Sequence, residues 1–393
     1  MESSNSGRYF ATNQSEAERR RKAAKSGNKH GNPITVPTKI LAAVADPTCP
    51  ESIFTAGAMG FVYRISLPLA KRIATYRGPE APATCLALGG REGKTIFAGS
   101  WDKVVWSWDI ESTKPGLAYR GHSDFVKAVV CTRLAGKEIL ISGGADKKIL
   151  VWDVETGRCM HTVQDPTTTM LAVQFLAVDP VATAADAVVV FSASSDPHIR
   201  RWQITLDGCQ QLPDSFHDRP GVERPTIEEH DTSVYKLVFD VDGDETDLWT
   251  ASADGTAKCL ARSRNFVADD VFAHGDFVRA VLVTDHWVIT AGRDEHVKVW
   301  DRVTGKLYCQ LEGHFEEVTE LVMLRNAQGL PDKFCSVSID RTIRTWPLDK
   351  AELDDVVRKI HEPPMPTTET PAGGGDKLLT AEEEAELAEL MDD

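Results

Sequence analysis

The sequence of 393 residues contains no apolar run near the roughly 18 residues that a membrane-spanning helix needs. Its first residues, MESSNSGRYFATNQ, lack the apolar core of a secretory signal peptide. The eight cysteines are scattered and form no CxxC pair, which is typical of reduced cysteines in an intracellular protein. We therefore expect no membrane contact and a cytoplasmic and/or nuclear location.

Sequence motifs of common catalytic sites are also missing. There is no HExxH, no GxSxG and no Cys/His cluster with metal-ligand spacing. The segment GGREGKT (89–95) resembles a phosphate-binding loop, but that motif needs a glycine where Leu88 stands and a helix after Lys94. A hairpin turn is the better interpretation. We predict no catalytic residue, no metal and no cofactor, and therefore a protein that is not an enzyme.

Charge is unevenly distributed along the chain. The net charge of −15 argues against sequence-independent binding to nucleic acid phosphates or anionic membranes. Residues 1–33 nevertheless hold a basic run, AERRRKAAKSGNKHG, and are predicted to be a disordered basic arm. The run itself reads as a solvated helix, and the alternative is a nuclear-import or RNA-contacting segment. Nucleic acid is expected as a partner only through this arm.

The C-terminal end differs in composition from the rest. Residues 351–377, which include PPMPTTETPAGGGDK, are predicted to be a linker. Residues 378–393 begin with a capping box at Thr380 and Glu383 and predict a short acidic helix. This helix is either a solubilising tail or an element that docks in a partner's groove.

Between the two ends, one pattern recurs with a period of about 40 to 58 residues. A small hydroxyl residue is followed four positions later by Asp, and six positions after that by Trp. The clearest copies are ILISGGADKKILVWDV, VFSASSDPHIRRWQI, WVITAGRDEHVKVWDR and FCSVSIDRTIRTWPL. Three weaker copies bring the total to seven. Apolar runs before and after each copy predict four strands per unit, and seven such units form a radial array of antiparallel sheets.

The repeat resembles the WD40 repeat of β-propellers, and the resemblance covers residues 34–350. The fold it implies is an all-β, seven-bladed β-propeller of four-stranded antiparallel blades. By the resemblance, each complete copy forms a buried hydrogen-bonded tetrad of His, Ser/Thr, Asp and Trp, which is structural. Three copies are complete: His122, Ser142, Asp146 and Trp152; His274, Thr290, Asp294 and Trp300; and His314, Ser336, Asp340 and Trp346.

Several copies depart from the pattern. The first lacks both Asp and Trp, and the fourth lacks the His and is followed by a long insertion at 206–229. In family members the N-terminal end supplies the outer strand of the last blade. The segment PITVPTK (33–39) is positioned for that role here, because nothing strand-like follows Trp346.

The resemblance also indicates one face of the propeller as the binding face. The residues that emerge there stand beside each turn Asp, or three and five positions after each His. They include aromatic and basic side chains, which are frequent hot spots of protein interfaces. The predicted partner-binding residues are Trp101, Phe125, Lys127, Tyr235, Phe277, Arg279 and Arg293. The alternative is that the Phe residues pack between blades and that only the charged residues are exposed. Trp106, near Trp101, is interpreted as a filler against a neighbouring blade.

Three functions are compatible with this pattern. The first is a non-catalytic scaffold or adaptor, monomeric within a hetero-complex, that docks a protein subunit or peptide on one face. The second is a substrate receptor of a ubiquitin ligase or a phosphopeptide reader, although no F-box and no Trp-Asp-x-Arg signature is present. The third is an RNA- or ribosome-assembly-associated factor that uses the basic arm.

Overall fold

The computed structural model describes residues 13–164, 170–215, 223–224, 226–241 and 245–362 of the chain. Strands dominate these residues, with two α-helices, α1 (Asn13–Ser26) and α2 (Lys350–His361), and two short 3-10 helices, Arg91–Gly93 and Arg262–Arg264. No helix among them combines the length and the apolar character that crossing a membrane requires.

The strands form seven four-stranded antiparallel sheets, which are the blades. Within each blade, the strands follow one another from the innermost to the outermost position. Blades 1 to 3 consist of β2 (Ile40–Ala45), β3 (Ser52–Gly57), β4 (Val62–Ser66) and β5 (Lys71–Tyr76); β6 (Ala83–Gly89), β7 (Thr95–Ser100), β8 (Val104–Asp109) and β9 (Pro115–Arg120); and β10 (Val126–Leu134), β11 (Lys137–Gly144), β12 (Ile149–Asp153) and β13 (Cys159–Val163).

Blades 4 to 6 repeat this arrangement, and blade 7 takes its fourth strand from the N-terminal end. The strands are β14 (Val173–Val178), β15 (Val188–Ser194), β16 (Ile199–Ile204) and β17 (Cys209–Leu212); β20 (Val234–Phe239), β21 (Leu248–Ser252), β22 (Thr256–Ala261) and β23 (Val267–Ala273); β24 (Val278–Val283), β25 (Trp287–Gly292), β26 (Val297–Asp301) and β27 (Leu307–Leu311); and β28 (Val318–Arg325), β29 (Pro331–Ser338), β30 (Thr342–Pro347) and β1 (Ile34–Thr35).

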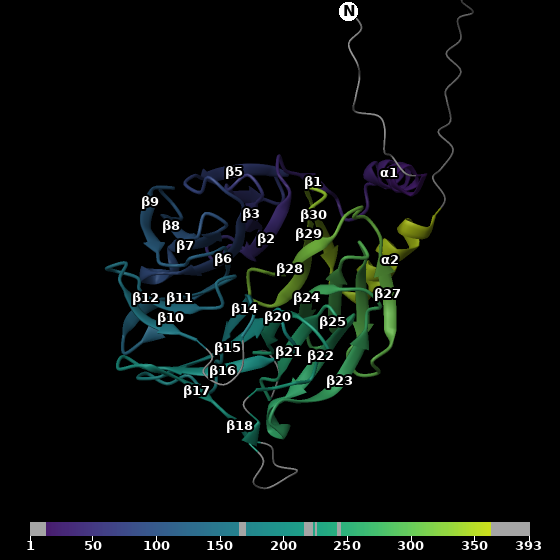
Figure 1. Ribbon diagram of the computed structural model, residues 1–393. Helices are drawn as coiled ribbons and strands as arrows, with labels where there is room; N and C mark the ends of the chain where they lie inside the picture. Colours follow the sequence, from purple (N-terminus) through teal and green to yellow (C-terminus); the bar gives the residue numbers. More distant parts are fainter. Residues whose placement is uncertain (1–12, 165–169, 216–222, 225, 242–244, 363–393) are drawn as a thin grey trace, which may run out of the picture. The chain divides into compact units, whose positions relative to one another are not determined.

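The seven blades close into a ring around a central channel. Each innermost strand contacts the innermost strand of the next blade, and β28 of blade 7 contacts β2 of blade 1 (Figure 1). The seven-bladed propeller predicted from the repeat is therefore confirmed.

The apolar core is divided between the blades rather than gathered in one place. Seven clusters of buried apolar side chains are found among the described residues, and each joins two neighbouring blades. A middle strand is covered on both faces by neighbouring blades, so its residues are buried without alternation, as in β25. The outermost strand β5, by contrast, begins with three exposed residues.

The N-terminal end closes the ring as predicted. Strand β1 pairs antiparallel with β30, with Ile34 opposite Ile343 and Thr35 opposite Thr342. The segment before β1 also lies along blade 7, where the backbone N–H of Thr345 donates to the carbonyl of Gly31 at 2.8 Å. Arg344 is buried beneath this segment and donates to the side-chain oxygen of Asn28 at 2.7 Å.

Both predicted terminal segments contain more structure than expected. The region 1–33 was predicted to be a disordered arm whose basic run forms a solvated helix. Residues 13–26 do form a helix, α1, but it makes ion pairs with blades 6 and 7. The predicted linker 351–377 starts with α2 instead. Its apolar residues recur at helical spacing and pack on the core shared by blades 6 and 7, with Leu353 fully buried. The predicted acidic helix at 378–393 lies outside the described residues.

The predicted insertion at 206–229 is also partly regular. It contains β17, the outer strand of blade 4, and a two-stranded hairpin of β18 (Asp214–Ser215) and β19 (Glu223–Arg224). Ile227 then forms an isolated bridge to Ile199 of the same blade. The insertion therefore begins after the outer strand rather than before it.

Closure by two residue pairs makes Ile34 a sensitive position. Its side chain is buried in the cluster between blades 7 and 1, whereas that of Thr35 is exposed. We expect Ile34→Glu to lower the free energy of unfolding by about 2–4 kcal/mol, because it places a charge in an apolar core. Thr35→Glu, one residue along the same strand, should have little effect. Thermal unfolding followed by circular dichroism measures both, and equal melting temperatures would contradict the role of β1.

Candidate functional site

The structure brings together all four members of each predicted tetrad. In blade 3, the Trp152 indole donates to the Ser142 hydroxyl at 2.8 Å, and that hydroxyl lies 2.7 Å from one ring nitrogen of His122. The other ring nitrogen of His122 lies 3.0 Å from the Asp146 carboxylate. Blades 6 and 7 have the same chain of contacts, with distances of 2.8–2.9 Å.

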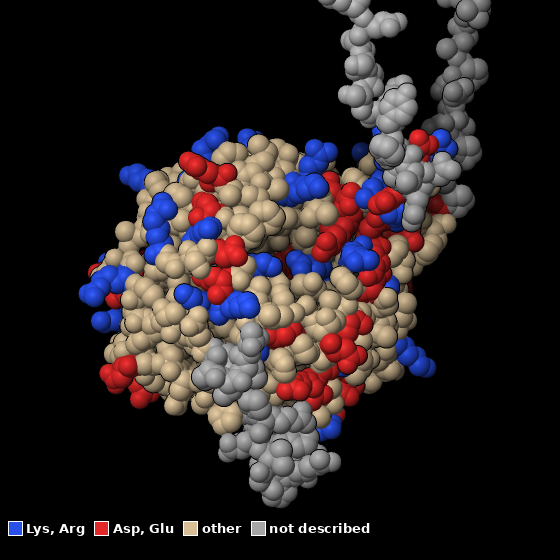
Figure 2. Space-filling model, in the orientation of Figure 1, with Lys and Arg blue, Asp and Glu red and all other residues tan. Residues whose placement is uncertain are grey.

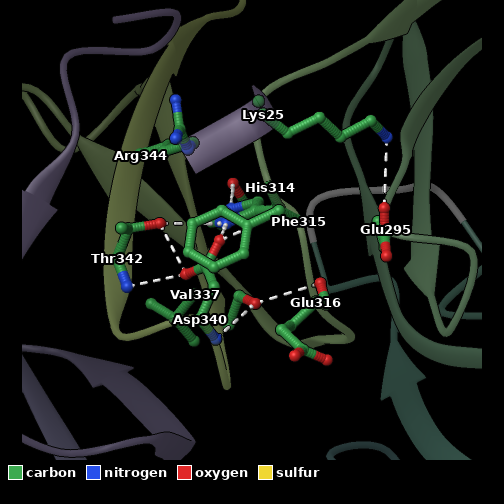
Figure 3. A network of polar contacts seen from close by, with 12 residues as sticks. Lys25, Glu295, His314, Phe315, Glu316, Val337, Asp340, Thr342 and Arg344 are labelled. Atoms are coloured by element: carbon green, nitrogen blue, oxygen red, sulfur yellow. Dashed lines mark hydrogen bonds and ion pairs between the residues drawn. The ribbon is translucent and has the colours of Figure 1, made fainter. Parts of the chain in front are cut away.

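In blade 7 the tetrad is buried and fixes the turn between β29 and β30. Figure 3 shows its His314 and Asp340 beside Thr342. The Asp340 carboxylate accepts the backbone N–H and the hydroxyl of Thr342, each at 2.7 Å. Burial lowers the pKa of His314, which favours the neutral ring that the hydrogen-bonded chain requires. Burial opposes ionisation of Asp340, but the hydrogen bonds from His314 and Thr342 outweigh it and lower the pKa of the carboxyl.

Blades without a complete tetrad provide other hydrogen-bond partners for the hydroxyl and the turn carboxylate. In blade 5, Leu260 stands in place of the Trp, and the Thr250 hydroxyl donates to the carbonyl of Lys258 at 3.3 Å. His230 still bridges Thr250 and Asp254, both at 2.7 Å. Blade 4 has no His at the tetrad position. There the buried Arg200 pairs with the turn carboxylate of Asp196 at 3.1 Å.

Trp106 in blade 2 has a role that the sequence interpretation missed. It was predicted to be a filler against a neighbouring blade, and it does pack on the apolar cluster between blades 1 and 2. Its indole also donates to the turn carboxylate of Asp102 at 2.9 Å. Trp108, two positions further along the chain, is the tetrad Trp of blade 2. Its indole donates to the carbonyl of Arg77 at 2.9 Å, because Ala98 stands where the complete tetrads have an accepting hydroxyl. Trp106 thus occupies the position that Arg200 holds in blade 4.

A recurring backbone hydrogen bond places the predicted binding residues on one face. In all seven blades, the residue before the turn position donates its N–H to a carbonyl in the loop that enters the blade, at 2.8–3.1 Å. In blade 6 this bond joins Arg293 to Phe277, and in blade 2 it joins Trp101 to Pro82. The loops that carry these residues meet at one end of the antiparallel strands, so their side chains share that end of the channel.

Two aromatic side chains form an exposed stack on this face. The rings of Trp101 and Phe125 lie 4.9 Å apart and nearly parallel, although they come from neighbouring blades. Their exposed fractions are 42% and 37%. Phe277 is exposed to 38%, and the guanidinium of Arg293 lies 4.5 Å from the centre of its ring. Phe125 and Phe277 are therefore surface residues rather than packing between blades.

The remaining three predicted residues lie at the mouth of the central channel. Lys127, Tyr235 and Arg279 line a cavity of about 390 Å³ to which the innermost strands of all seven blades contribute. Trp101 lies at its edge. The Arg279 guanidinium covers the Tyr235 ring at 4.3 Å, which joins blades 6 and 5. The seven residues thus form a surface around one opening, which we call the channel-mouth face.

Charge at the channel mouth is not fully balanced. Arg279 pairs with Glu317 at 3.0 Å, and Lys236 pairs with Glu320 at 2.6 Å. Lys127 instead donates to the side-chain amide oxygen of Gln174 at 3.2 Å. Burial and the like charge of Arg279 lower the pKa of Lys127. An anionic group that entered the mouth would stabilise the charged form of this lysine.

No group of three potential metal ligands is found among the described residues. A larger hollow, about 1040 Å³, lies beside the ring closure and is lined by loops of blades 7 and 1. Its charged residues are of both signs, such as Lys29, Glu51 and Asp332, and it contains none of the predicted binding residues. The channel-mouth face is therefore the candidate functional site.

The buried turn carboxylate of blade 7 should be essential for stability. Asp340→Ala leaves His314 and the Thr342 N–H without their acceptor, and we expect a loss of about 2–4 kcal/mol. Asp285→Ala, in an exposed turn of blade 6, serves as the matched control and should have little effect. Thermal unfolding measures both variants, and a melting temperature unchanged by Asp340→Ala would contradict the buried network.

Comparison with known proteins agrees with this geometry. Residues 119–214 match the family model described as the tRNA methyltransferase TRM82 WD40 domain, and residues 70–109 and 269–301 match the WD domain, G-beta repeat. An uncharacterized WD repeat-containing protein of Schizosaccharomyces pombe is 30% identical, with 100% of both chains covered.

More distant relatives match part of their length. A pre-mRNA-processing factor 19 homolog of Arabidopsis thaliana is 24% identical over 55% of this chain and 37% of its own length. A p21-activated protein kinase-interacting protein 1-like protein of Xenopus laevis is 23% identical over 70% of this chain and 66% of its own length. Together with the tetrads and the seven closed blades, these matches show that the chain belongs to the WD-repeat (WD40) family.

Proposed function

We propose that this protein is a non-catalytic scaffold that docks a protein partner on its channel-mouth face. The observation that carries the proposal is the exposed stack of Trp101 and Phe125 beside a mouth lined by Lys127 and Arg279. Exposed aromatic side chains bury a large area with little loss of rotamer freedom, so they are suited to anchor a partner.

The basic residues at the mouth set the chemistry of the partner. Lys127 is partly desolvated and bonds to the amide oxygen of Gln174, while the carboxylate of Asp124 acts on its charge without an ion pair, so it favours an acidic group of the incoming segment. The Arg293 guanidinium above Phe277 is exposed and held only loosely by Asp276, at 3.7 Å. We therefore expect a partner segment that places an apolar side chain on the Trp101–Phe125 stack and an acidic side chain over the mouth.

The double variant Trp101→Ala with Arg293→Glu tests the face. We expect it to capture the partner at least tenfold less than wild type while it keeps the same melting temperature. Affinity purification with mass spectrometry compares the captured proteins. Val303→Asp is the control, since Val303 is exposed in the β26–β27 turn at the opposite end of the strands. An unchanged partner list for the double variant would contradict the proposal.

A second candidate function is more specific. The match of residues 119–214 to the tRNA methyltransferase TRM82 WD40 domain covers all the strands of blades 3 and 4. It supports a role as the non-catalytic subunit of a complex that modifies tRNA. Phe125 and Lys127 of the channel-mouth face lie within this matched region. The partner on the face would then be the catalytic subunit.

Loss of the chain should then remove a methylated nucleoside from tRNA. Nucleosides from purified tRNA of deletion cells can be measured by liquid chromatography and mass spectrometry. Expression of the wild type or of Val303→Asp should restore the nucleoside, whereas Trp101→Ala with Arg293→Glu should not. A normal set of methylated nucleosides in the deletion cells would exclude this candidate but not the general scaffold function.

A further inference from the structure

Among residues 16–26, the contacts that hold helix α1 on the propeller are ion pairs. Arg21 makes two hydrogen bonds with the carboxylate of Glu295, at 2.5 and 2.6 Å, and Lys25 reaches the same carboxylate at 3.1 Å. Lys22 pairs with Glu316 at 2.8 Å. All three alanines of the helix are exposed, and no residue among 16–26 is buried. The contact therefore lacks the apolar burial that holds α2 in place.

The receiving surface is a part of the propeller rather than of the N-terminal segment. Glu295 follows the turn residue Asp294 of blade 6, and Glu316 lies two positions after His314 of blade 7. The tetrads of blades 6 and 7 therefore fix both carboxylates in space. Figure 2 shows Asp and Glu side chains gathered beside α1, and Figure 3 shows Lys25 reaching Glu295 beside the blade 7 network. We call the Glu295–Glu316 surface the acidic rim.

Glu295 is the distinctive residue of the acidic rim. Its side chain is only 7% exposed, and all its side-chain partners among the described residues belong to α1. Burial raises the pKa of this carboxyl, but the bonds from Arg21 and Lys25 outweigh burial and lower it. With α1 in place the Glu295 carboxylate is covered by the helix, and Arg21 and Lys25 supply the counter-ions that this burial requires. The propeller thus presents a preformed receptor for a guanidinium group.

We propose that the acidic rim is a binding site for a Lys/Arg-rich helix of another protein, and that α1 occupies this site within the same chain. The spacing of the α1 contacts defines the ligand. Arg21 and Lys25 are four positions apart and share one helix face directed at blade 6, while Lys22 is turned toward blade 7. The ligand should therefore carry basic residues at positions i, i+1 and i+4. This inference does not depend on the channel-mouth face.

The short segment that joins α1 to β1 sets how strongly α1 competes with another helix for the acidic rim. Only residues 27–33 separate α1 from the closing strand β1, so the helix is presented to the rim at an effective concentration of about millimolar order. To displace α1, a ligand helix must bind the free acidic rim with enough affinity to compete against this effective concentration of α1. The cationic side chains of Arg21, Lys22 and Lys25 are partly exposed in these pairs, so both the intramolecular and the intermolecular complex should weaken as salt rises.

A labelled peptide of residues 13–26 tests the proposal with the full-length chain. Fluorescence anisotropy at 50 mM NaCl measures its binding to wild type and to Arg21→Glu with Lys25→Glu, in which the helix of the chain is repelled from the rim. We expect at least tenfold tighter binding to the variant. Arg19→Glu with Arg20→Glu, which changes the same charge at two exposed residues of α1, is the matched control and should bind like wild type.

Glu295→Gln, added to the Arg21→Glu and Lys25→Glu variant, should weaken peptide binding at least tenfold. Trp101→Ala in the same background should leave it unchanged, which separates this site from the channel-mouth face. Equal affinity of the peptide for wild type and for the variant would overturn the masking by α1. An affinity that does not respond to Glu295→Gln would overturn the site itself.

A second measurement needs no substitution in α1. Glu295→Gln in the otherwise wild-type chain should speed amide hydrogen exchange of residues 16–26 at least tenfold, because the helix loses its main contact. Glu155→Gln, at an exposed turn between β12 and β13, is the control and should leave the exchange unchanged. Equal exchange in the two variants would show that Glu295 does not hold α1.

Discussion

The need to satisfy a turn carboxylate in six of the seven blades is the constraint on which the rest of this propeller depends. His122, His274 and His314 meet it in the complete blades, while Trp106 and Arg200 meet it in blades 2 and 4. Because a buried charge without partners is costly, each solution locks its turn in one conformation. The residues beside the carboxylate then acquire fixed positions as well. Trp101 and Arg293 precede it, and Glu295 follows it.

The sequence was sufficient to predict the seven blades, because the Ser/Thr–Asp–Trp spacing recurs and the network it forms is local. It was also sufficient for the closing strand, since the segment PITVPTK (33–39) has the strand pattern that blade 7 lacks after Trp346. The repeat pattern did not predict which residues bind the turn carboxylate in the blades that lack the tetrad His. Trp106 and Arg200 lie four positions after the turn Asp, where other blades carry Lys258, Lys298 or Arg344. Because the residue type at this position varies between blades, its contact with the turn carboxylate can be recognised only from the distances in the structure.

The two helices show different limits of sequence reasoning. Helix α2 had a detectable signal, because Leu353, Val356, Val357 and Ile360 recur at helical spacing after Asp349, which caps the helix by accepting the N–H of Ala351 at 2.9 Å. The position of α1 had no such signal. Its basic residues contact carboxylates about 270 to 294 positions away, and nothing local in the sequence pairs them. The aromatic stack of Trp101 and Phe125 is likewise a contact between blades, so only the common face of the two residues was predictable.

The two-residue strand β1 has a consequence for how the chain is made. Ile34 pairs with Ile343, which emerges from the ribosome some 309 residues later, so the ring cannot close until blade 7 has been synthesised. The entropic cost of joining such distant positions grows only slowly with their separation, but the search for the pairing slows folding. Until blade 7 is complete, the apolar surfaces of blades 7 and 1 have no cover, and the nascent chain is most exposed to aggregation at that point.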